Sequence, residues 1–494
     1  MKLHVKAATV NRIESDVWTL LVTHEGWKQD LHHNLPQLAK DVVSHLEHIG
    51  FEAKASEVQL VPTFGKINSR FVCVAGIGDK EKVHVSTVRE VVATLVRQTT
   101  RNKLNSVVID FSVLNANTGF EGLSQAAAEG AFLGSYTFDK YKSAAKKSPS
   151  AETNVYLVVP PNRLQFAANG VKKGEIFAKA TMYARDLVNE SPTITTPTFL
   201  AEQAKKLSKK DVLTVEILNE AHIRKLGMGA YLSVTRGSDE PAKFMVMTYK
   251  GGGKKKIVLA GKAITFDTGG LSLKDAKNME TMKLDMAGGA AVLGVMSMLP
   301  ILKPKVTVVG LIAACENMPG AKATKPGDIA TAFNGTTIEI LNTDAEGRLT
   351  LADVLSYAVT LKPDMIIDLA TLTGACMVAL GEEIAGVFSN SEDLTKSITA
   401  AAKQAGELVW SLPLEEAYRE SVKSDIADLR NIAKTRYGGA ITAALFLEEF
   451  VGQVPWAHLD IAGPAFEEKG SSLRPKGGTG FGVRLLLELL TTFK

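Results

Sequence analysis

Short apolar runs alternate with stretches of helical spacing along most of the chain. This alternation predicts an α/β protein, in which helices cover a mainly parallel sheet. In the first third of the chain, we expect strands at residues 18–22, 71–75, 107–111 and 155–159, and helices at 85–101 and 123–133. Later, we expect strands at residues 215–218, 242–249, 257–260, 306–311, 337–341, 365–369 and 458–461, separated mostly by helical patterns such as 289–298 and 349–359.

One long helical pattern, at residues 171–189, separates two parts of the chain. It ends near Ser191 and Pro192, because proline cannot continue a helix and the residue before it prefers an extended backbone. We therefore predict a smaller N-terminal α/β domain at residues 1–170, a connecting helix at 171–190 and a larger C-terminal catalytic domain at 191–494. The larger domain is expected to contain a mainly parallel, mixed central sheet flanked by helices.

Composition and charge narrow the class of protein. With 45% hydrophobic residues, 22% charged residues and a net charge of +4, the chain has little to attract nucleic acid or an anionic membrane. We find no apolar stretch near the roughly 18 residues of a membrane span, and no signal-peptide core. The odd, scattered Cys73, Cys315 and Cys376 predict buried free thiols and a cytoplasmic location. Seven of nine histidines lie at or before His84 without metal-ligand spacing, so we expect surface or cap positions.

Two carboxylates lie where a predicted strand gives way to a predicted helix. Residues 342–349 read Asn-Thr-Asp-Ala-Glu-Gly-Arg-Leu, so Asp344 and Glu346 are two positions apart. On an extended backbone, side chains at this spacing point to one face, and the site of an open α/β sheet lies at the carboxyl ends of its strands. Two neighbouring acids repel each other unless a cation joins them, so we expect a divalent metal site. The alternative is a polar turn that caps the helix.

A second, glycine-rich stretch supplies further candidates. Lys262, Asp267 and Lys274 follow a predicted strand, and Asp285 precedes a predicted helix. The two stretches together offer oxygen ligands, which suit Mg²⁺, Mn²⁺ or Zn²⁺, and no histidine. Four separate carboxylates suit two metal ions better than one, and a pair roughly 3.5–4 Å apart is the usual hydrolytic arrangement. Lys274 offers a cation to an oxyanion, and Arg348 offers a planar fork to an anion.

Other catalytic classes find little support in the sequence. There is no HExxH motif of a zincin and no GxSxG nucleophile elbow. Lys262 is followed by Ala263, which excludes a Walker loop, and the glycines at residues 76–78 lack the third glycine of a dinucleotide loop. Cys376 has no histidine nearby in sequence and is expected to be a buried thiol. His458 lies in an apolar run and is expected to be a hydrogen-bonded core residue.

Residues 342–349, together with 261–274 and 282–286, resemble the leucyl aminopeptidase (cytosol aminopeptidase, M17) family, whose signature is the octapeptide. Further similarity lies at residues 317–319, 325–328, 370–375, 456–463 and 478–482. The resemblance covers essentially the whole second domain and is faint in the first. Two departures, Asp275 where the family often has Pro and Ala287 where it often has Gly or Cys, affect no expected ligand.

This resemblance implies a site for two divalent metal ions per subunit. Asp267 and Glu346 would bridge the two metals. Asp344 would complete one site, and Lys262 with Asp285 would complete the other, which exchanges its metal more readily. A lysine binds a metal only as a neutral amine, so the cations would have to lower its pKa strongly. Family members use Mn²⁺, Zn²⁺, Mg²⁺ or Co²⁺, and the sequence does not choose among them.

The resemblance also implies an aminopeptidase that removes N-terminal residues, with a preference for leucine, from peptides with a free N-terminus. The peptide's amino group would bind one metal and Asp285, and Lys274 would face the scissile carbonyl. Arg348 would hold a bicarbonate ion that relays the proton. The residues expected to contact the substrate are Met282, Thr371, Leu372 and Gly374. The expected assembly is a homohexamer without a membrane partner.

Two other functions stay open at this point. A different two-metal hydrolase, such as a phosphoesterase, would cleave phosphate esters and would not need a free amine in its substrate. A DNA-binding regulator would bind DNA with an affinity that falls steeply as salt rises, although the small net charge argues against this as the main role. A purely structural role is disfavoured by the complete set of candidate ligands.

Overall fold

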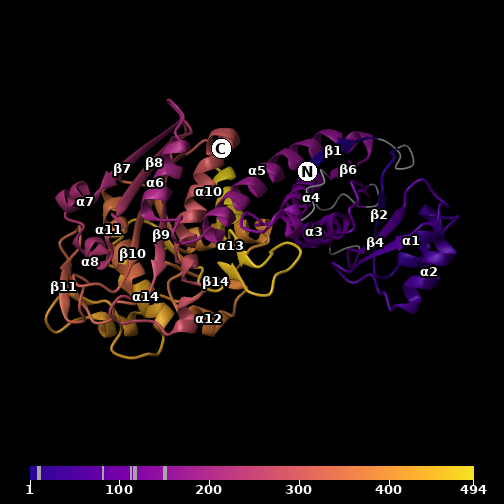
Figure 1. The fold of residues 1–494 in the computed structure, drawn as a ribbon. Helices are drawn as coiled ribbons and strands as arrows, with labels where there is room; N and C mark the ends of the chain where they lie inside the picture. The colour runs from indigo at the N-terminus through magenta and orange to yellow at the C-terminus, as the bar shows by residue number, and fades with distance from the viewer. Residues whose placement is uncertain (8–12, 80–82, 112–113, 115–118, 148–152, 494) are drawn as a thin grey trace. The chain divides into compact units, whose positions relative to one another are not determined.

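The computed structural model describes residues 1–7, 13–79, 83–111, 114, 119–147 and 153–493 (Figure 1). These residues form two compact units. The N-terminal unit comprises Met1–Lys179 with Lys469–Pro475, and the C-terminal unit comprises Ala180–Glu468 with Lys476–Lys494. The boundary falls inside one long helix, α5 (Leu164–Asn189), which begins at Leu164 rather than at the predicted residue 171.

The N-terminal unit is built on a six-stranded sheet with helices on both faces (Figure 1). Its strands follow the order β1 (Lys2–Lys6), β6 (Asn154–Val158), β5 (Ser106–Asp110), β2 (Val17–Val22), β4 (Phe71–Gly76) and β3 (Val58–Pro62). Neighbouring strands are parallel except β3 and β4. Its α-helices are α1 (Trp27–Asn34), α2 (Ala39–His48), α3 (Val85–Arg101) and α4 (Phe120–Ser135).

Successive residues of β4 pack into two different hydrophobic cores. Val72 and Val74 belong to the core that contains residues of α1 and α2, whereas Cys73 and Ala75 belong to the core that contains residues of α3 and α4. Side chains alternate between the two faces of a strand, and here both faces are buried. The strand is therefore a continuous apolar run, which explains why the sequence predicts it almost residue for residue.

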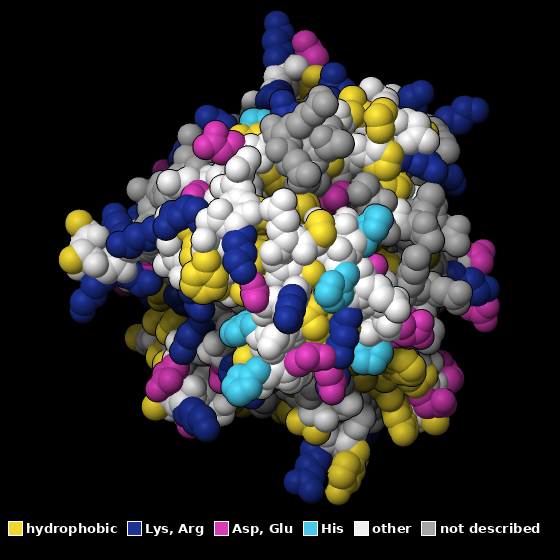
Figure 2. All heavy atoms as spheres, turned by 90° about the vertical axis from the view of Figure 1, so that its right-hand side faces the viewer, with side chains coloured by type: hydrophobic (Ala, Val, Ile, Leu, Met, Phe, Trp, Pro, Cys, Tyr) yellow, Lys and Arg dark blue, Asp and Glu magenta, His cyan; other side chains and the backbone are white. Residues whose placement is uncertain are grey.

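Five of the seven histidines of the N-terminal unit lie at helix ends, whereas His4 lies in β1 and His24 in a turn. His32 and His33 lie in the last turn of α1, and His45 and His48 lie in the last turn of α2. His84 is the N-cap residue of α3. All five are exposed, and Figure 2 shows several histidine side chains on one face of this unit. These are the surface and cap positions that their spacing predicts.

The C-terminal unit contains an eight-stranded mixed sheet, which confirms the predicted fold class. Its strands follow the order β15 (Leu408–Ser411), β14 (Ile384–Ser389), β17 (Trp456–Asp460), β13 (Met365–Ala370), β9 (Lys256–Asp267), β10 (Thr307–Asn317), β8 (Lys243–Lys250) and β7 (Leu213–Asn219). The central strands β17, β13, β9 and β10 are parallel to their neighbours in this group. The pairs β10–β8, β8–β7 and β14–β17 are antiparallel.

Helices cover both faces of this sheet (Figure 1). One group packs together on the sheet and comprises α10 (Ala287–Leu302), α13 (Glu392–Ala405) and α15 (Val483–Thr491). A second group comprises α8 (Gly229–Thr235), α11 (Glu346–Thr360), α12 (Gly374–Leu380) and α14 (Gly439–Glu448). The remaining elements of the unit are short: α6 (Pro197–Lys206), α7 (Glu220–Leu226), α9 (Ala276–Met279), and the strands β11 (Asp328–Thr331), β12 (Thr337–Ile340), β16 (Leu429–Arg430), β18 (Phe466–Glu467) and β19 (Gly477–Gly478).

Strand β9 is longer than predicted, and this corrects the position of two candidate residues. The sequence prediction ended the strand at residue 260 and placed Lys262 and Asp267 in a following loop. In the structure Lys262 lies within β9, and Asp267 is its last residue. The prediction took Gly261 as a turn residue, whereas in the structure it allows β9 to pack closely against α10. A Cβ at Gly261 would lie 2.6 Å from the backbone oxygen of Gly288, near the start of α10.

The strand before the octapeptide also differs from the prediction. Strand β12 belongs to a separate three-stranded sheet, β11–β12–β16, and not to the central sheet. It ends at Ile340, so Asp344 follows in a turn and Glu346 is already the first residue of α11. The argument from an extended backbone was therefore wrong about the local geometry, although both side chains still approach one centre.

The segment Met282–Leu302, which includes α10, corrects the expectation that no stretch approaches a membrane span. This segment has 21 residues and a mean hydropathy of 1.6, so it passes a test of length and composition. However, 78% of its most apolar window is buried inside the protein. Core helices of globular proteins pass the same test, and the glycines and alanines of α10 pack directly on β9 and β10.

Asp353, in α11, is expected to be essential to the stability of the C-terminal unit. Its two carboxylate oxygens accept hydrogen bonds from the backbone nitrogens of Tyr231 and Phe333, each at 2.7 Å, and the residue is fully buried. Asp353→Ala would leave one buried and one part-buried N–H group without their partner and should lower the free energy of unfolding by about 2–5 kcal/mol. Urea denaturation measures this loss. Asp353→Asn, which keeps one acceptor, should cost less, and an unchanged midpoint for the alanine variant would contradict the prediction.

Candidate metal centre

Three buried or half-buried carboxylates meet where β9 ends and α11 begins. Asp267, Asp344 and Glu346 each offer an oxygen, and these oxygens lie within 4.8 Å of one another. Asp267 comes from the carboxyl end of a central strand, after which Gly269 and Gly270 turn the chain with φ angles of 86° and 64°. These left-handed angles are accessible to glycine without strain. The structure thus brings together residues from both sequence stretches, at a spacing that one cation can bridge.

Lys262 and Asp285 lie beside this cluster. The Lys262 Nζ atom lies 2.7 Å from Asp285 Oδ1 and 2.8 Å from Glu346 Oε1, and it donates a hydrogen bond to the Thr371 backbone oxygen at 2.9 Å. A Cβ at Gly347 would lie within 2.5–2.8 Å of the end of this lysine side chain. The glycine of the octapeptide therefore makes room for Lys262.

Lys274 contacts the other side of the cluster. Its Nζ atom lies 2.9 Å from Asp267 Oδ2 and 2.6 Å from Asp344 Oδ1. Its side chain keeps 15% of its surface exposed, compared with 4% for Lys262. Lys274 is therefore the lysine that a molecule entering from solvent can reach.

Negative charge exceeds positive charge in this centre. Four carboxylates face two lysines, and burial together with repulsion from Glu346 raises the pKa of Asp267 to about 7. Burial opposes the charge on Lys262 and on Lys274, but the surrounding carboxylates outweigh it and raise both pKa values above the ordinary range. The excess negative charge is the electrostatic condition that attracts divalent cations.

Two buried oxygen atoms in the centre, Asp285 Oδ2 and Glu346 Oε2, have neither a hydrogen-bond partner nor an ion pair among the described residues, and a third, Asp344 Oδ1, has only the Lys274 ammonium 2.6 Å away. Buried polar atoms are normally satisfied, so such a pair calls for a specific explanation. Carboxylate oxygens are ligands for Mg²⁺, Mn²⁺ and Zn²⁺. The donor set, its charge and these two atoms all fit divalent metal ions.

Arg348 provides a positively charged group that could bind an anion. It lies in the first turn of α11 and is 8% exposed, and its Nη1 donates a hydrogen bond to the Asn431 backbone oxygen at 2.8 Å. Its Nε atom is buried without a partner. Burial lowers the pKa of Arg348 to about 10, so the guanidinium stays charged at neutral pH. A small anion would satisfy both the charge and the free N–H group.

The segment after β13 borders the centre. The Thr371 hydroxyl donates to Asp285 Oδ1 at 2.6 Å. Asp460, the last residue of β17, accepts hydrogen bonds from the Leu372 nitrogen at 3.2 Å and from the Thr373 hydroxyl at 2.6 Å. Two further residues are expected to bind substrate. Met282 lies in the 3₁₀ turn that also contains Asp285, and Gly374 is the first residue of α12. Their roles stay predictions.

His458 and Cys376, which were considered as a metal ligand and as a nucleophile, are both buried in the core. His458 is fully buried, and its Nδ1 lies 2.6 Å from Asp368 Oδ1, which confirms the expected core histidine. Cys73, Cys315 and Cys376 are free and buried, as predicted. Burial raises the pKa of Cys376 to about 12, so the group is a thiol and not a thiolate nucleophile at neutral pH.

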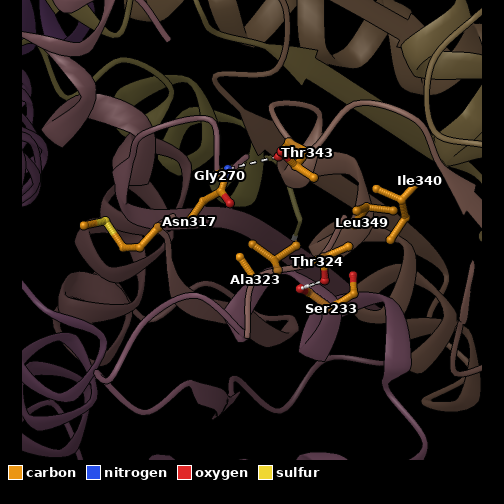
Figure 3. Close-up of a pocket in the computed structure, with 10 residues that line it drawn as sticks. Ser233, Gly270, Asn317, Ala323, Thr324, Ile340, Thr343 and Leu349 are labelled. Carbon is orange, nitrogen blue, oxygen red and sulfur yellow. Dashed lines mark hydrogen bonds between the residues drawn. The ribbon is translucent and has the colours of Figure 1, made fainter. Parts of the chain in front are cut away.

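The sequence analysis assigned no role to Asn317, which the structure places against the centre. This residue ends β10, and its side-chain amide donates to Asp267 Oδ1 at 2.8 Å. Figure 3 shows it beside Gly270 and Thr343. Because β10 runs parallel to β9 with Asn317 opposite Asp267, a correct prediction of both strand ends would have found this neighbour.

The fold and the centre together define a metal-dependent hydrolase with an α/β architecture. The catalytic-domain model of the cytosol aminopeptidase family matches residues 182–487, and the model of its N-terminal domain matches residues 21–145. The chain belongs to the cytosol aminopeptidase family, peptidase family M17, and is a metal-dependent exopeptidase that acts at the N-terminus of peptides.

Individual relatives agree with this assignment. A protein of Aquifex aeolicus (strain VF5) named probable cytosol aminopeptidase is 48% identical over 452 residues, which cover 91% of this chain and 89% of the relative. The structure of the bottromycin maturation enzyme BotP in complex with Mn is 34% identical, with a TM-score of 0.85 and coverage of 97% of this chain and 99% of BotP. A mutant of the tomato leucine aminopeptidase is 33% identical, with a TM-score of 0.89 and coverage of 100% and 96%.

Proposed function

We propose that this aminopeptidase uses two divalent metal ions per subunit to release N-terminal residues, with a preference for leucine. The observation that carries the proposal is the cluster of Asp267, Asp344 and Glu346 beside the unpartnered oxygen of Asp285. One ion would be held by Asp267, Asp344 and Glu346. The other would be held by Lys262 and Asp285 together with Asp267 and Glu346. Mn²⁺ or Zn²⁺ is the expected metal, and Mg²⁺ or Co²⁺ also suits these ligands.

Lys262 must change its protonation state when a cation binds. In the present surroundings the carboxylates of Asp285 and Glu346 raise its pKa and hold it as an ammonium. Only the neutral amine has a lone pair for a metal, so Lys262 would release a proton as the cation takes over the neutralisation of the carboxylates.

Three side chains around the substrate would have different roles in the reaction. Bound metal ions would polarise the scissile carbonyl and lower the pKa of a water molecule. Lys274, the more exposed lysine, would donate to the oxygen on which negative charge develops. Asp285 would orient the free amino group of the peptide, which explains why internal peptide bonds would be spared. Arg348 would hold a bicarbonate ion whose basic oxygen accepts the proton, so no histidine is needed as base.

The substrate would lie along the segment after β13. Thr371 and Leu372 are fixed there by hydrogen bonds to Asp285 and Asp460. Gly374 presents an open backbone, since a Cβ at this position would meet no atom within 4 Å. Met282 would contribute to the apolar pocket for the first side chain. We also propose a cytoplasmic location and a homohexamer, in keeping with the family resemblance, and we assign no nucleic-acid or membrane partner.

Hydrolysis of leucine p-nitroanilide tests the proposal. Chelator-treated protein should be inactive, and Mn²⁺ or Zn²⁺ should restore activity as the two sites fill. An N-acetylated substrate should not be cleaved under the same conditions, because it lacks the amine that Asp285 and a metal would bind. Activity that survives chelation, or equal cleavage of the acetylated substrate, would contradict the proposal. Phosphate esters serve as a control and should stay intact.

A further inference from the structure

Asn317 connects the two loops that carry the candidate metal ligands. Its side-chain nitrogen donates to Asp267 Oδ1 at 2.8 Å and to the Thr343 backbone oxygen at 3.0 Å. Its own backbone oxygen accepts hydrogen bonds from the nitrogen and hydroxyl of Thr268, at 3.0 and 2.8 Å. The residue is only 4% exposed. One buried amide therefore contacts the loop after β9 and the loop before α11.

Thr343 completes this connection from the opposite side. Its hydroxyl donates to the Gly269 backbone oxygen at 2.6 Å and accepts a hydrogen bond from the Ser272 nitrogen at 2.8 Å. Its nitrogen in turn donates to the Ser272 hydroxyl at 3.1 Å. Because Thr343 precedes Asp344 directly, these bonds fix the backbone that carries the second carboxylate. The two loops are thus held as one unit.

The hydrogen bonds also determine which oxygen of Asp267 faces the centre. Oδ1 accepts both the Asn317 amide and the Gly269 nitrogen, each at 2.8 Å. Oδ2 is left to face Lys274, 2.9 Å away. These two hydrogen bonds restrict rotation of the Asp267 carboxylate. Without the Asn317 amide, only the Gly269 nitrogen would hold it.

The surroundings of Asn317 leave little space for a ligand of its own. A cavity of about 10 Å³ lies beside it, lined also by Gly270, Thr343, Ser233 and Thr324 (Figure 3). This volume holds about one water molecule, so nothing larger can approach Asn317 from that side. A Cβ at Gly270 would lie 2.9 Å from Asn317 Oδ1, which shows how closely the loop is packed.

We propose that Asn317 is a positioning residue that orients the Asp267 carboxylate and ties it to the Asp344 loop, so that the metal ligands are preformed. This inference rests on the proposed two-metal function. Groups that orient metal ligands through hydrogen bonds typically contribute about 10–100-fold to metal affinity. Loss of the amide should therefore weaken metal binding before it affects the fold, because the backbone bonds of Thr343 and Thr268 remain.

The test is a calorimetric titration of chelator-treated protein with Mn²⁺. Asn317→Ala and Asn317→Leu, which keeps a branched side chain and adds no charge, should each weaken Mn²⁺ binding about 10-fold or more. At saturating Mn²⁺, both should lower kcat and leave the KM for leucine p-nitroanilide within about threefold, because Asn317 does not touch the substrate. Ser233→Ala is the matched control. It lines the same cavity, and its hydroxyl donates only to the Ala230 backbone oxygen, so its Mn²⁺ affinity should be unchanged.

The outcomes separate this inference from the proposed function. Mn²⁺ affinity within about threefold of wild type in both Asn317 variants would overturn the inference, as would an equal loss in Ser233→Ala. If the alanine variant fails to fold, the leucine variant carries the test alone, because it fills the space of the asparagine side chain without its hydrogen-bond donor. Wild-type protein that binds Mn²⁺ without cleaving leucine p-nitroanilide would instead contradict the proposed peptidase function.

Discussion

Replacing Glu346 with glutamine should lower kcat/KM for leucine p-nitroanilide by about a thousandfold or more, equivalent to about 4 kcal/mol of transition-state stabilisation. Glu346 is 2% exposed and lies 2.8 Å from the Lys262 ammonium, within the cluster that also includes Asp267 and Asp344. The amide keeps the shape of the side chain but removes the charge that both proposed metal sites share. The same variant should bind Mn²⁺ much more weakly.

The control for this variant is Glu316→Gln. Glu316 lies in strand β10, and its carboxylate accepts a hydrogen bond from the Ser238 hydroxyl at 2.6 Å rather than from a lysine of the centre. It should retain most of the activity. Circular dichroism of the metal-free proteins establishes that both variants fold. If folded Glu346→Gln keeps activity within about tenfold of wild type at saturating metal, Glu346 is not a shared ligand.

Lys274→Met should reduce kcat by about 100- to 1,000-fold, the usual cost of removing one donor from an oxyanion site. Its effect on metal binding should have the opposite sign to that of Glu346→Gln. The Lys274 ammonium contacts Asp267 and Asp344, so its removal leaves two carboxylates with less positive charge nearby. Mn²⁺ affinity should therefore stay the same or rise while turnover falls.

Steady-state kinetics at saturating Mn²⁺, combined with a Mn²⁺ titration, tests this separation. Lys277→Met is the matched control, because Lys277 lies on the adjacent short helix α9 and is exposed. It should behave as wild type in both measurements. A Lys274→Met protein whose kcat recovers fully when more metal is added would show that Lys274 supports metal binding and not the reaction itself.

The sequence predicted the candidate ligands better than their local structure. The octapeptide and the glycine-rich stretch are specific enough to nominate Asp267, Asp285 and Glu346 without any structure. The prediction failed where glycine was taken as a turn signal, since Gly261 lies inside β9 and packs against Gly288. Local sequence does not reveal whether a glycine serves a turn or a close contact with a distant helix.

The sequence also did not predict which strands pair with one another. Strand β12 was predicted among the strands of the larger domain, yet it pairs with β11 and β16 in a separate sheet. Strands β14 and β15, at one side of the central sheet, were not predicted. Asn317 lies opposite Asp267 because the parallel strands β10 and β9 end side by side, and this brings the Asn317 amide next to the Asp267 carboxylate. Each of these features depends on which strands become neighbours, and that is decided by packing of the whole unit.

The two lysines of the centre have a consequence for how metal reaches the enzyme. Lys262 and Lys274 already supply part of the counter-charge to the carboxylates, so we expect a newly synthesised chain to complete its fold without metal. Metal loading then becomes an exchange reaction on a finished protein, in which incoming cations displace the ammonium groups from their carboxylates. The supply of free metal in the cell, rather than the supply of folded chain, would then set how much of this enzyme is active.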